Sequence, residues 1–144
     1  MLTARMFGGL ALVLAVPALL WAEHVTVATD LYLHDTYYVV GPRFPLLFGA
    51  IVSAIMALVC FAAIRWASRP LNRLLVLISF VLIALAYGVY LTVGYRVSVA
   101  AYPAHWQIWT LIGAMFSFIV GCLIFAINVI WTLIRLLSVH FSMR

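Results

Sequence analysis

Charged residues are scarce in this chain. They make up 8% of its 144 residues, lysine is absent, and eight arginines stand against three acids. Hydrophobic residues reach 69%, and the mean hydropathy is +1.26. A water-soluble domain needs a charged surface that this composition cannot supply, so the sequence predicts an integral membrane protein. The net charge of +5 is therefore not taken as a sign of nucleic-acid binding.

Acids and bases are also missing from the middle of the apolar runs. Proton pumps and ion-coupled transporters normally need an ionisable group there, so transport is disfavoured. Among the few polar residues, Asn128 is expected to hydrogen-bond a neighbouring helix. Cys60 and Cys122 lie within apolar runs without a nearby histidine or acid, so they are interpreted as small buried hydrophobic residues and not as metal ligands.

Four apolar runs approach or exceed the roughly 20 residues that cross about 30 Å of hydrocarbon. They predict an all-α, polytopic bundle of four transmembrane helices in a single domain over residues 1–144. The expected helices cover 6–22, 44–64, 74–95 and 108–134, with an outer loop at 23–43, an inner loop at 65–73 and an outer loop at 96–107.

The first run has two interpretations. Arg5, the apolar core that follows it and Leu20-Trp21-Ala22 fit a secretory signal, but the run also fits an uncleaved anchor, which is what we expect. Pro17 is tolerable inside it if the helix kinks or if neighbouring helices satisfy the freed carbonyl.

Small residues recur at helical spacing in two of the runs, where they would allow close approach between helices. They are Gly49, Ala50, Ser53, Ala54 and Ala57 in the second run, and Gly113, Ala114, Ser117 and Gly121 in the fourth.

The arginines predict the orientation in the membrane. With a cytoplasmic N-terminus, six of them lie on the cytoplasmic side, at positions 5, 65, 69, 73, 135 and 144. Arg43 and Arg96 remain on the other side with Glu23, Asp30 and Asp35. This asymmetry follows the positive-inside rule and predicts cytoplasmic N- and C-termini. We expect a bacterial inner membrane, with the loop around residue 34 facing the periplasm.

The segment His34-Asp35-Thr36-Tyr37-Tyr38-Val39-Val40 is unusual in so apolar a chain. It resembles the start of the tenth transmembrane helix of subunit I of the haem-copper cytochrome c oxidases. A second block, with Tyr102-Pro103, Trp109 and Ser117-Phe118-Ile119, resembles the start of the twelfth helix without a gap in the alignment. The resemblance covers about four fifths of the chain, from Asp30 to the C-terminus, and implies the last three helices of that subunit.

The chain departs from the family where the chemistry lies. The family follows the motif with Ala-His-Phe-His, whose histidines hold the two haem irons, but this chain has Gly41-Pro42-Arg43-Phe44. Proline and phenylalanine offer iron no lone pair. We therefore expect no enzymatic activity, no catalytic residues and no haem-binding residues.

In the family, the matched histidine and aspartate help to bind Mg or Mn at the contact with subunit II. The resemblance therefore makes His34 and Asp35 candidate metal ligands, for a Mg or Mn ion shared with a partner subunit. The same segment also fits a polar helix start, with Asp35 or Thr36 capping backbone N–H groups, or a protein contact. In the resemblance, Val97 and Ser98 stand where the family has its two propionate-binding arginines, so both of those cations are missing here.

Two functions follow. The first is a non-catalytic accessory or assembly subunit of a membrane energy-transducing complex, such as a respiratory oxidase in electron transport, with lipid and other membrane subunits as partners. The second is a small membrane haem- or metal-binding protein for cofactor delivery or electron transfer. It would use the outer histidines His24, His34 and His105.

Overall fold

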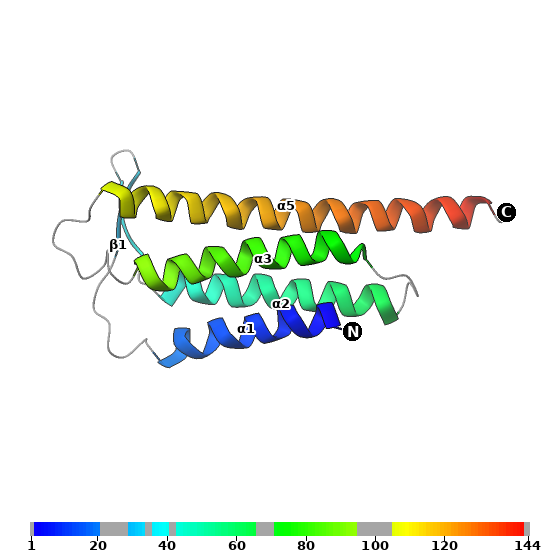
Figure 1. Ribbon diagram of the computed structural model, residues 1–144, viewed down its shortest axis with the longest axis horizontal. Coiled ribbons are helices and arrows are strands. Elements are labelled where there is room, and N and C mark those ends of the chain that lie inside the picture. The colour runs from blue at the N-terminus through cyan, green and yellow to red at the C-terminus, as the bar shows by residue number, and fades with distance from the viewer. Residues whose placement is uncertain are drawn as a thin grey trace.

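The computed structural model describes residues 2–20, 29–33, 36–40, 43–65, 71–94 and 105–142. The four long helices run alternately up and down, so that the start of α1 and the end of α5 lie at the same end of the bundle (Figure 1). In chain order the elements are α1 (Leu2–Leu20), β1 (Thr29–Leu33), β2 (Thr36–Val40), α2 (Arg43–Arg65), α3 (Arg73–Val89), the π-helix η2 (Tyr90–Gly94) and α5 (His105–Ser142).

All four long helices have the length and apolar composition to cross a membrane, which confirms the predicted set of four spans in an integral membrane protein. Pro17 lies inside α1, which starts at Leu2 and not at residue 6. The largest difference is in α5, which has 38 residues where 27 were expected. At 1.5 Å per residue α5 is about 57 Å long, so it projects past the other helices (Figure 1).

The segment before α2 differs from the expected loop and helix start. Thr29–Leu33 and Thr36–Val40 form an antiparallel hairpin, in which Tyr32 pairs with Tyr37 and Leu33 with Thr36. Aromatic and β-branched residues favour such strands. The helix begins only at Arg43, so Thr36 does not cap it, and the expected capping role of this residue is wrong.

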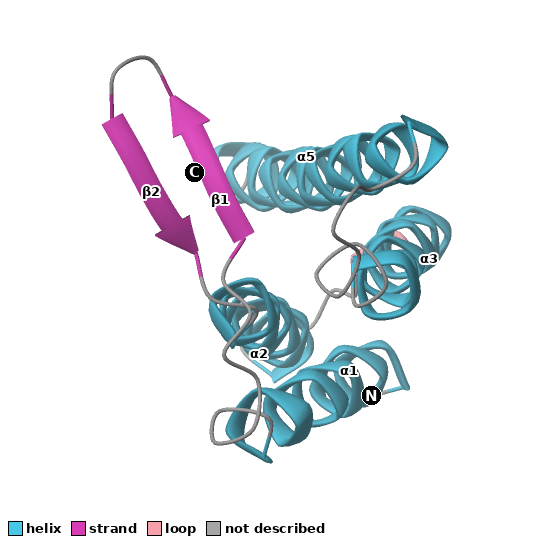
Figure 2. Ribbon diagram, turned by 90° about the vertical axis from the view of Figure 1, so that its left-hand side faces the viewer, coloured by secondary structure: helices cyan, strands magenta, loops and turns pink. Residues whose placement is uncertain are grey.

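The helices associate as two close pairs, α1 with α2 and α3 with α5 (Figure 2). Buried positions along α5 include Ala114, Gly121, Phe125 and Asn128, which are separated by seven, four and three residues. Such spacing is typical of helices that pack at a small left-handed crossing angle, as most membrane bundles do.

Phe7 joins the two pairs. Its side chain is fully buried, and its ring lies edge-on to Phe80 of α3 at 5.5 Å and to Phe125 of α5 at 5.6 Å between centroids. Edge-to-face aromatic contacts of this kind are stabilising beyond the area they bury. Phe7 is therefore one of the contacts through which α1 packs against the second pair.

Two of the predicted small residues permit close contacts. A Cβ on Gly49 would collide with the ring of Tyr87, and a Cβ on Gly121 would lie 2.9 Å from Cγ1 of Ile83. Gly113, by contrast, has nothing within 4 Å of an added Cβ. The stripe on α5 therefore serves helix packing at Gly121 but not at Gly113.

Asn128 forms the interhelical hydrogen bonds predicted for it. Its Oδ1 accepts from the backbone N–H of Asn72 at 3.2 Å, and its Nδ2 donates to the backbone carbonyl of Asn72 at 3.1 Å. The Asn72 side chain in turn accepts from the N–H of Leu74 at 3.0 Å and caps α3. A polar residue of α5 thus fixes the place where α3 begins.

Candidate functional site

The predicted metal ligands fall in the hairpin connection. The register pairs Leu33 with Thr36, which leaves only His34 and Asp35 between the two strands. Both residues lie outside the described part of the chain, as does His24. The Mg or Mn site at His34 and Asp35 therefore stays a prediction.

The remaining candidate ligands are dispersed. His105 is the first residue of α5 and is exposed, while Cys60 of α2 is buried and Cys122 of α5 is half-buried. Within residues whose placement is described, no three histidine, cysteine or acidic side chains come close enough to share a metal ion. Both cysteines are free. Cys60 lies beside Thr3 at one end of the bundle, and Cys122 packs among apolar side chains.

Phe44 begins a row of aromatic rings that extends over three helices. It lies in the first turn of α2 and stacks on Phe48, with 6.5 Å between centroids and 12° between planes. Phe48 contacts Phe118 of α5 at 6.0 Å. Phe118 then lies edge-on to Tyr87 of α3 at 5.6 Å.

This aromatic row, Phe44-Phe48-Phe118-Tyr87, connects three helices near the hairpin. The absence of a side chain at Gly49 lets the Tyr87 ring pack directly against α2. Sequence reasoning did not find the row as a unit. Phe44 and Phe48 are four residues apart and so share one helix face, which was a usable signal, but their partners on α3 and α5 follow only from the packing.

Polar groups inside the bundle are used for packing. Ser79 Oγ donates to the carbonyl of Leu75 at 2.7 Å, and Thr132 Oγ1 donates to the carbonyl of Asn128 at 2.8 Å. Ser53 is fully buried, and its hydroxyl has no partner among the described residues. Hydrogen bonds within a helix turn satisfy side chains without creating a site.

Most of α5 is exposed, as is most of each other long helix. In one 18-residue window of each span, 17% of the residues are buried in α5, 22% in α1 and 28% in both α2 and α3. The exposed face of α5 carries large apolar side chains over six turns: Met115, Phe116, Ile119, Val120, Leu123, Ile127, Ile130, Trp131, Ile134 and Leu137. Near its far end the Arg135 guanidinium lies 5.3 Å from the centroid of the Trp131 ring. Such a face suits lipid or the helix of another subunit.

Comparison with known proteins identifies no relative. No protein-family model matches the chain, no curated protein matches it, and no solved structure matches it. The resemblance to oxidase subunit I thus rests on the quoted residues alone.

Proposed function

We propose that this chain is a non-catalytic accessory or assembly subunit of a membrane energy-transducing complex of the respiratory oxidase kind. The observation that carries the proposal is the aromatic row at Phe44. The oxidase subunit that the sequence resembles needs an imidazole at this position, and a phenyl ring gives iron no lone pair. Here the Phe44 ring stacks on Phe48 of the same helix and is 65% exposed, so it presents an apolar surface where the family has a ligand.

The mechanism would be docking between membrane helices. An apolar face does not drive association in lipid by the hydrophobic effect, so partner helices are held by close packing and by a few polar contacts. Only 17% of an 18-residue window of α5 is buried by the chain's own helices, so this helix offers a broad packing surface. We expect the host complex to cover part of this surface and lipid to cover the rest.

Crosslinking from native membranes tests the proposal. A photoreactive residue at Ile127 would stand on the uncovered face of α5, where the native side chain is 61% exposed. The matched control is a photoreactive residue at Leu12 of α1, which is 68% exposed. We expect defined membrane-protein adducts from Ile127, identified by mass spectrometry as subunits of one energy-transducing complex, and fewer or different adducts from Leu12.

Two results would contradict the proposal. The first is recovery of the chain only as a monodisperse protein without partners, in mild detergent and from every membrane preparation. The second is a haem absorbance band, or turnover with dioxygen, from the isolated polypeptide. The first result would mean that the chain functions without docking to other subunits, and the second that it binds haem or is catalytic.

A shared metal site is the second candidate, and it is supported by the resemblance of His34 and Asp35 to the family's metal-binding pair. Two ligands are too few for Mg or Mn without a partner and water. The shared metal site is tested by measuring the Mg and Mn content of the intact complex from cells that carry His34→Ala or Asp35→Ala. His105→Ala is the control. Unchanged Mg and Mn content in both variants would remove the candidate.

A further inference from the structure

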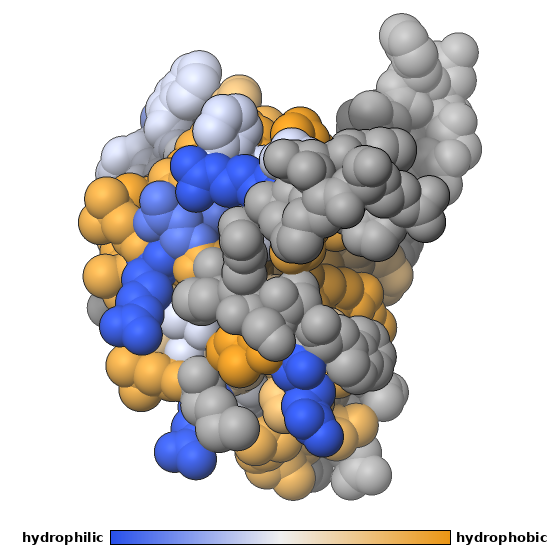
Figure 3. Space-filling view, turned by 90° about the vertical axis from the view of Figure 1, so that its right-hand side faces the viewer, coloured by the Kyte–Doolittle hydropathy of each residue, from blue (hydrophilic) through white to orange (hydrophobic). Residues whose placement is uncertain are grey.

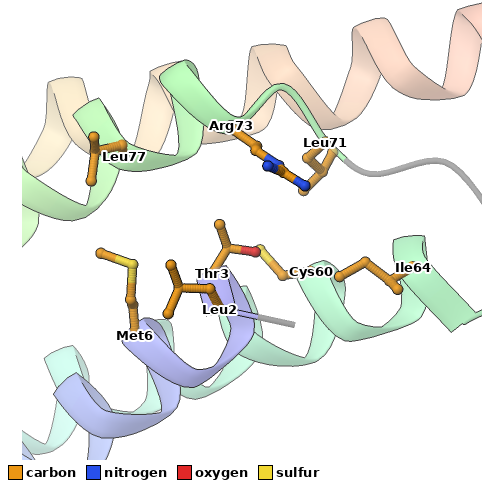
Figure 4. A pocket seen from close by; sticks show the side chains of 8 residues that line it. All are labelled: Leu2, Thr3, Met6, Cys60, Ile64, Leu71, Arg73 and Leu77. Carbon is orange, nitrogen blue, oxygen red and sulfur yellow. The ribbon is translucent and has the colours of Figure 1, made fainter.

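The end of the bundle that carries Arg5, Arg65 and Arg73, called here the arginine end, contains a cavity. Its volume is about 250 Å³, and it lies where the start of α1, the end of α2 and the start of α3 meet (Figure 4). The side chains that line it are Leu2, Thr3, Met6, Cys60, Ile64, Leu71, Arg73 and Leu77.

The lining combines one cation with an apolar wall. Among the described lining residues Arg73 alone is charged, and its side chain extends alongside Leu71 on the side of the cavity that faces Thr3 and Cys60 (Figure 4). The Thr3 hydroxyl lies next to the Cys60 thiol. Among the described lining side chains, the Arg73 guanidinium, the Thr3 hydroxyl and the Cys60 thiol can donate hydrogen bonds, and only the guanidinium is charged.

This cation has no carboxylate to neutralise it in the described structure. All three acids of the chain lie between residues 23 and 35, and none is among the described residues of the arginine end. The described side chains at the arginine end form no ion pair, and strongly hydrophilic residues gather on this face (Figure 3). No carboxylate of the described residues therefore competes with an external anion for Arg73.

We propose that the cavity binds the headgroup of an anionic phospholipid. The Arg73 guanidinium would hold the phosphate by a forked pair of hydrogen bonds, and the glycerol and first methylenes would lie against Leu2 and Met6. The ends of apolar spans lie at headgroup depth, where such a lipid is present at high local concentration. This inference is independent of the proposed docking function.

The size of the cavity supports a headgroup as its occupant. At about 250 Å³ it is smaller than the roughly 300–1,000 Å³ typical of sites that enclose a whole small molecule. A phosphate with its glycerol fits such a volume, while the acyl chains would remain outside along α1 and α3. A water-soluble metabolite would gain little from the apolar wall and would have to reach a site that opens at the membrane surface.

The test uses the full chain in mild detergent, delipidated and titrated with phosphatidylglycerol, with the thermal unfolding midpoint as readout. We expect a saturable rise of the midpoint. In Arg73→Gln the half-saturating lipid concentration should increase about tenfold, because a hydrogen-bonded charge is lost. The matched control is Arg65→Gln, which removes the same charge at the same end but does not line the cavity, and it should change the value less than about twofold.

A second variant keeps the proposal testable if Arg73→Gln does not fold. Thr3→Phe fills the cavity and leaves Arg73 in place, so it should abolish the saturable rise of the unfolding midpoint. The phosphatidylglycerol adduct that native mass spectrometry detects on the wild-type chain should be absent from this variant. Equal effects of Arg65→Gln and Arg73→Gln would overturn the proposal, since they would indicate general surface attraction. An equal rise with phosphatidylcholine, or with inorganic phosphate alone, would overturn it as well.

Discussion

The hydrogen bonds between Asn128 and Asn72 give the most direct prediction about stability. Asn128→Leu keeps a side chain of similar size but removes both bonds, of 3.2 and 3.1 Å. Interhelical hydrogen bonds in membranes contribute about 0.6 kcal/mol on average and up to about 1.7. Two of them correspond to about 1–3 kcal/mol. We expect the upper part of this range, because Asn128 is only 1% exposed and its loss leaves the Asn72 N–H without its partner.

The Asn72 carbonyl loses less, because it also accepts from the Val76 N–H at 3.0 Å. The free energy of unfolding in mixed micelles is the measurement. The control is Ser53→Ala, which removes a fully buried hydroxyl that has no partner in the described structure. It should change stability by less than about 0.5 kcal/mol or increase it slightly.

A double-mutant cycle separates the two parts of this contact. Asn72→Ala removes the cap on Leu74, at a cost of about 1 kcal/mol, but keeps the backbone groups that bond Asn128. The two substitutions should therefore add to within about 0.5 kcal/mol although the residues touch. The reasoning is refuted if Asn128→Leu is no more destabilising than Ser53→Ala, or if the pair is strongly non-additive.

Two further predictions concern packing. Gly121→Ala should destabilise the protein by about 1–3 kcal/mol, because the new Cβ would lie 2.9 Å from Ile83 and 3.1 Å from a backbone carbonyl. The control Gly113→Ala should be nearly neutral. The free energy of unfolding is the measurement, and equal effects of the two substitutions would contradict the packing argument. Phe7→Ala should cost at least about 2 kcal/mol and loosen α1 from the second pair, measured by proteolysis and unfolding, while the control Phe116→Ala, at a site 64% exposed, should cost much less.

Hydropathy identified the four spans because length and apolar composition alone decide membrane crossing. It misplaced the end of α5, where the apolar window closes near Arg135 although Leu136 and Leu137 continue the helix to Ser142. Orientation in the membrane, which was derived from the arginines, stays a prediction.

The sequence predicted some residues that make contacts between helices, but not their partners. Asn128 was expected to bond another helix, but its partner is a backbone 56 residues away, and no local pattern identifies such a partner. The hairpin was missed because the segment was interpreted through its resemblance to a helix start, although Thr36, Tyr37 and Val39 favour strands. The cavity at Arg73 joins three helices that are separated in sequence, so only the folded bundle reveals it.

The division into two helix pairs has a consequence for biosynthesis. The α1–α2 pair is complete once about 65 residues have left the ribosome, because its contacts are all within that stretch. The start of α3 obtains its polar partner only when Asn128 has been made. The third helix should therefore stay at the insertion machinery until the fourth arrives, and the two should enter the lipid together.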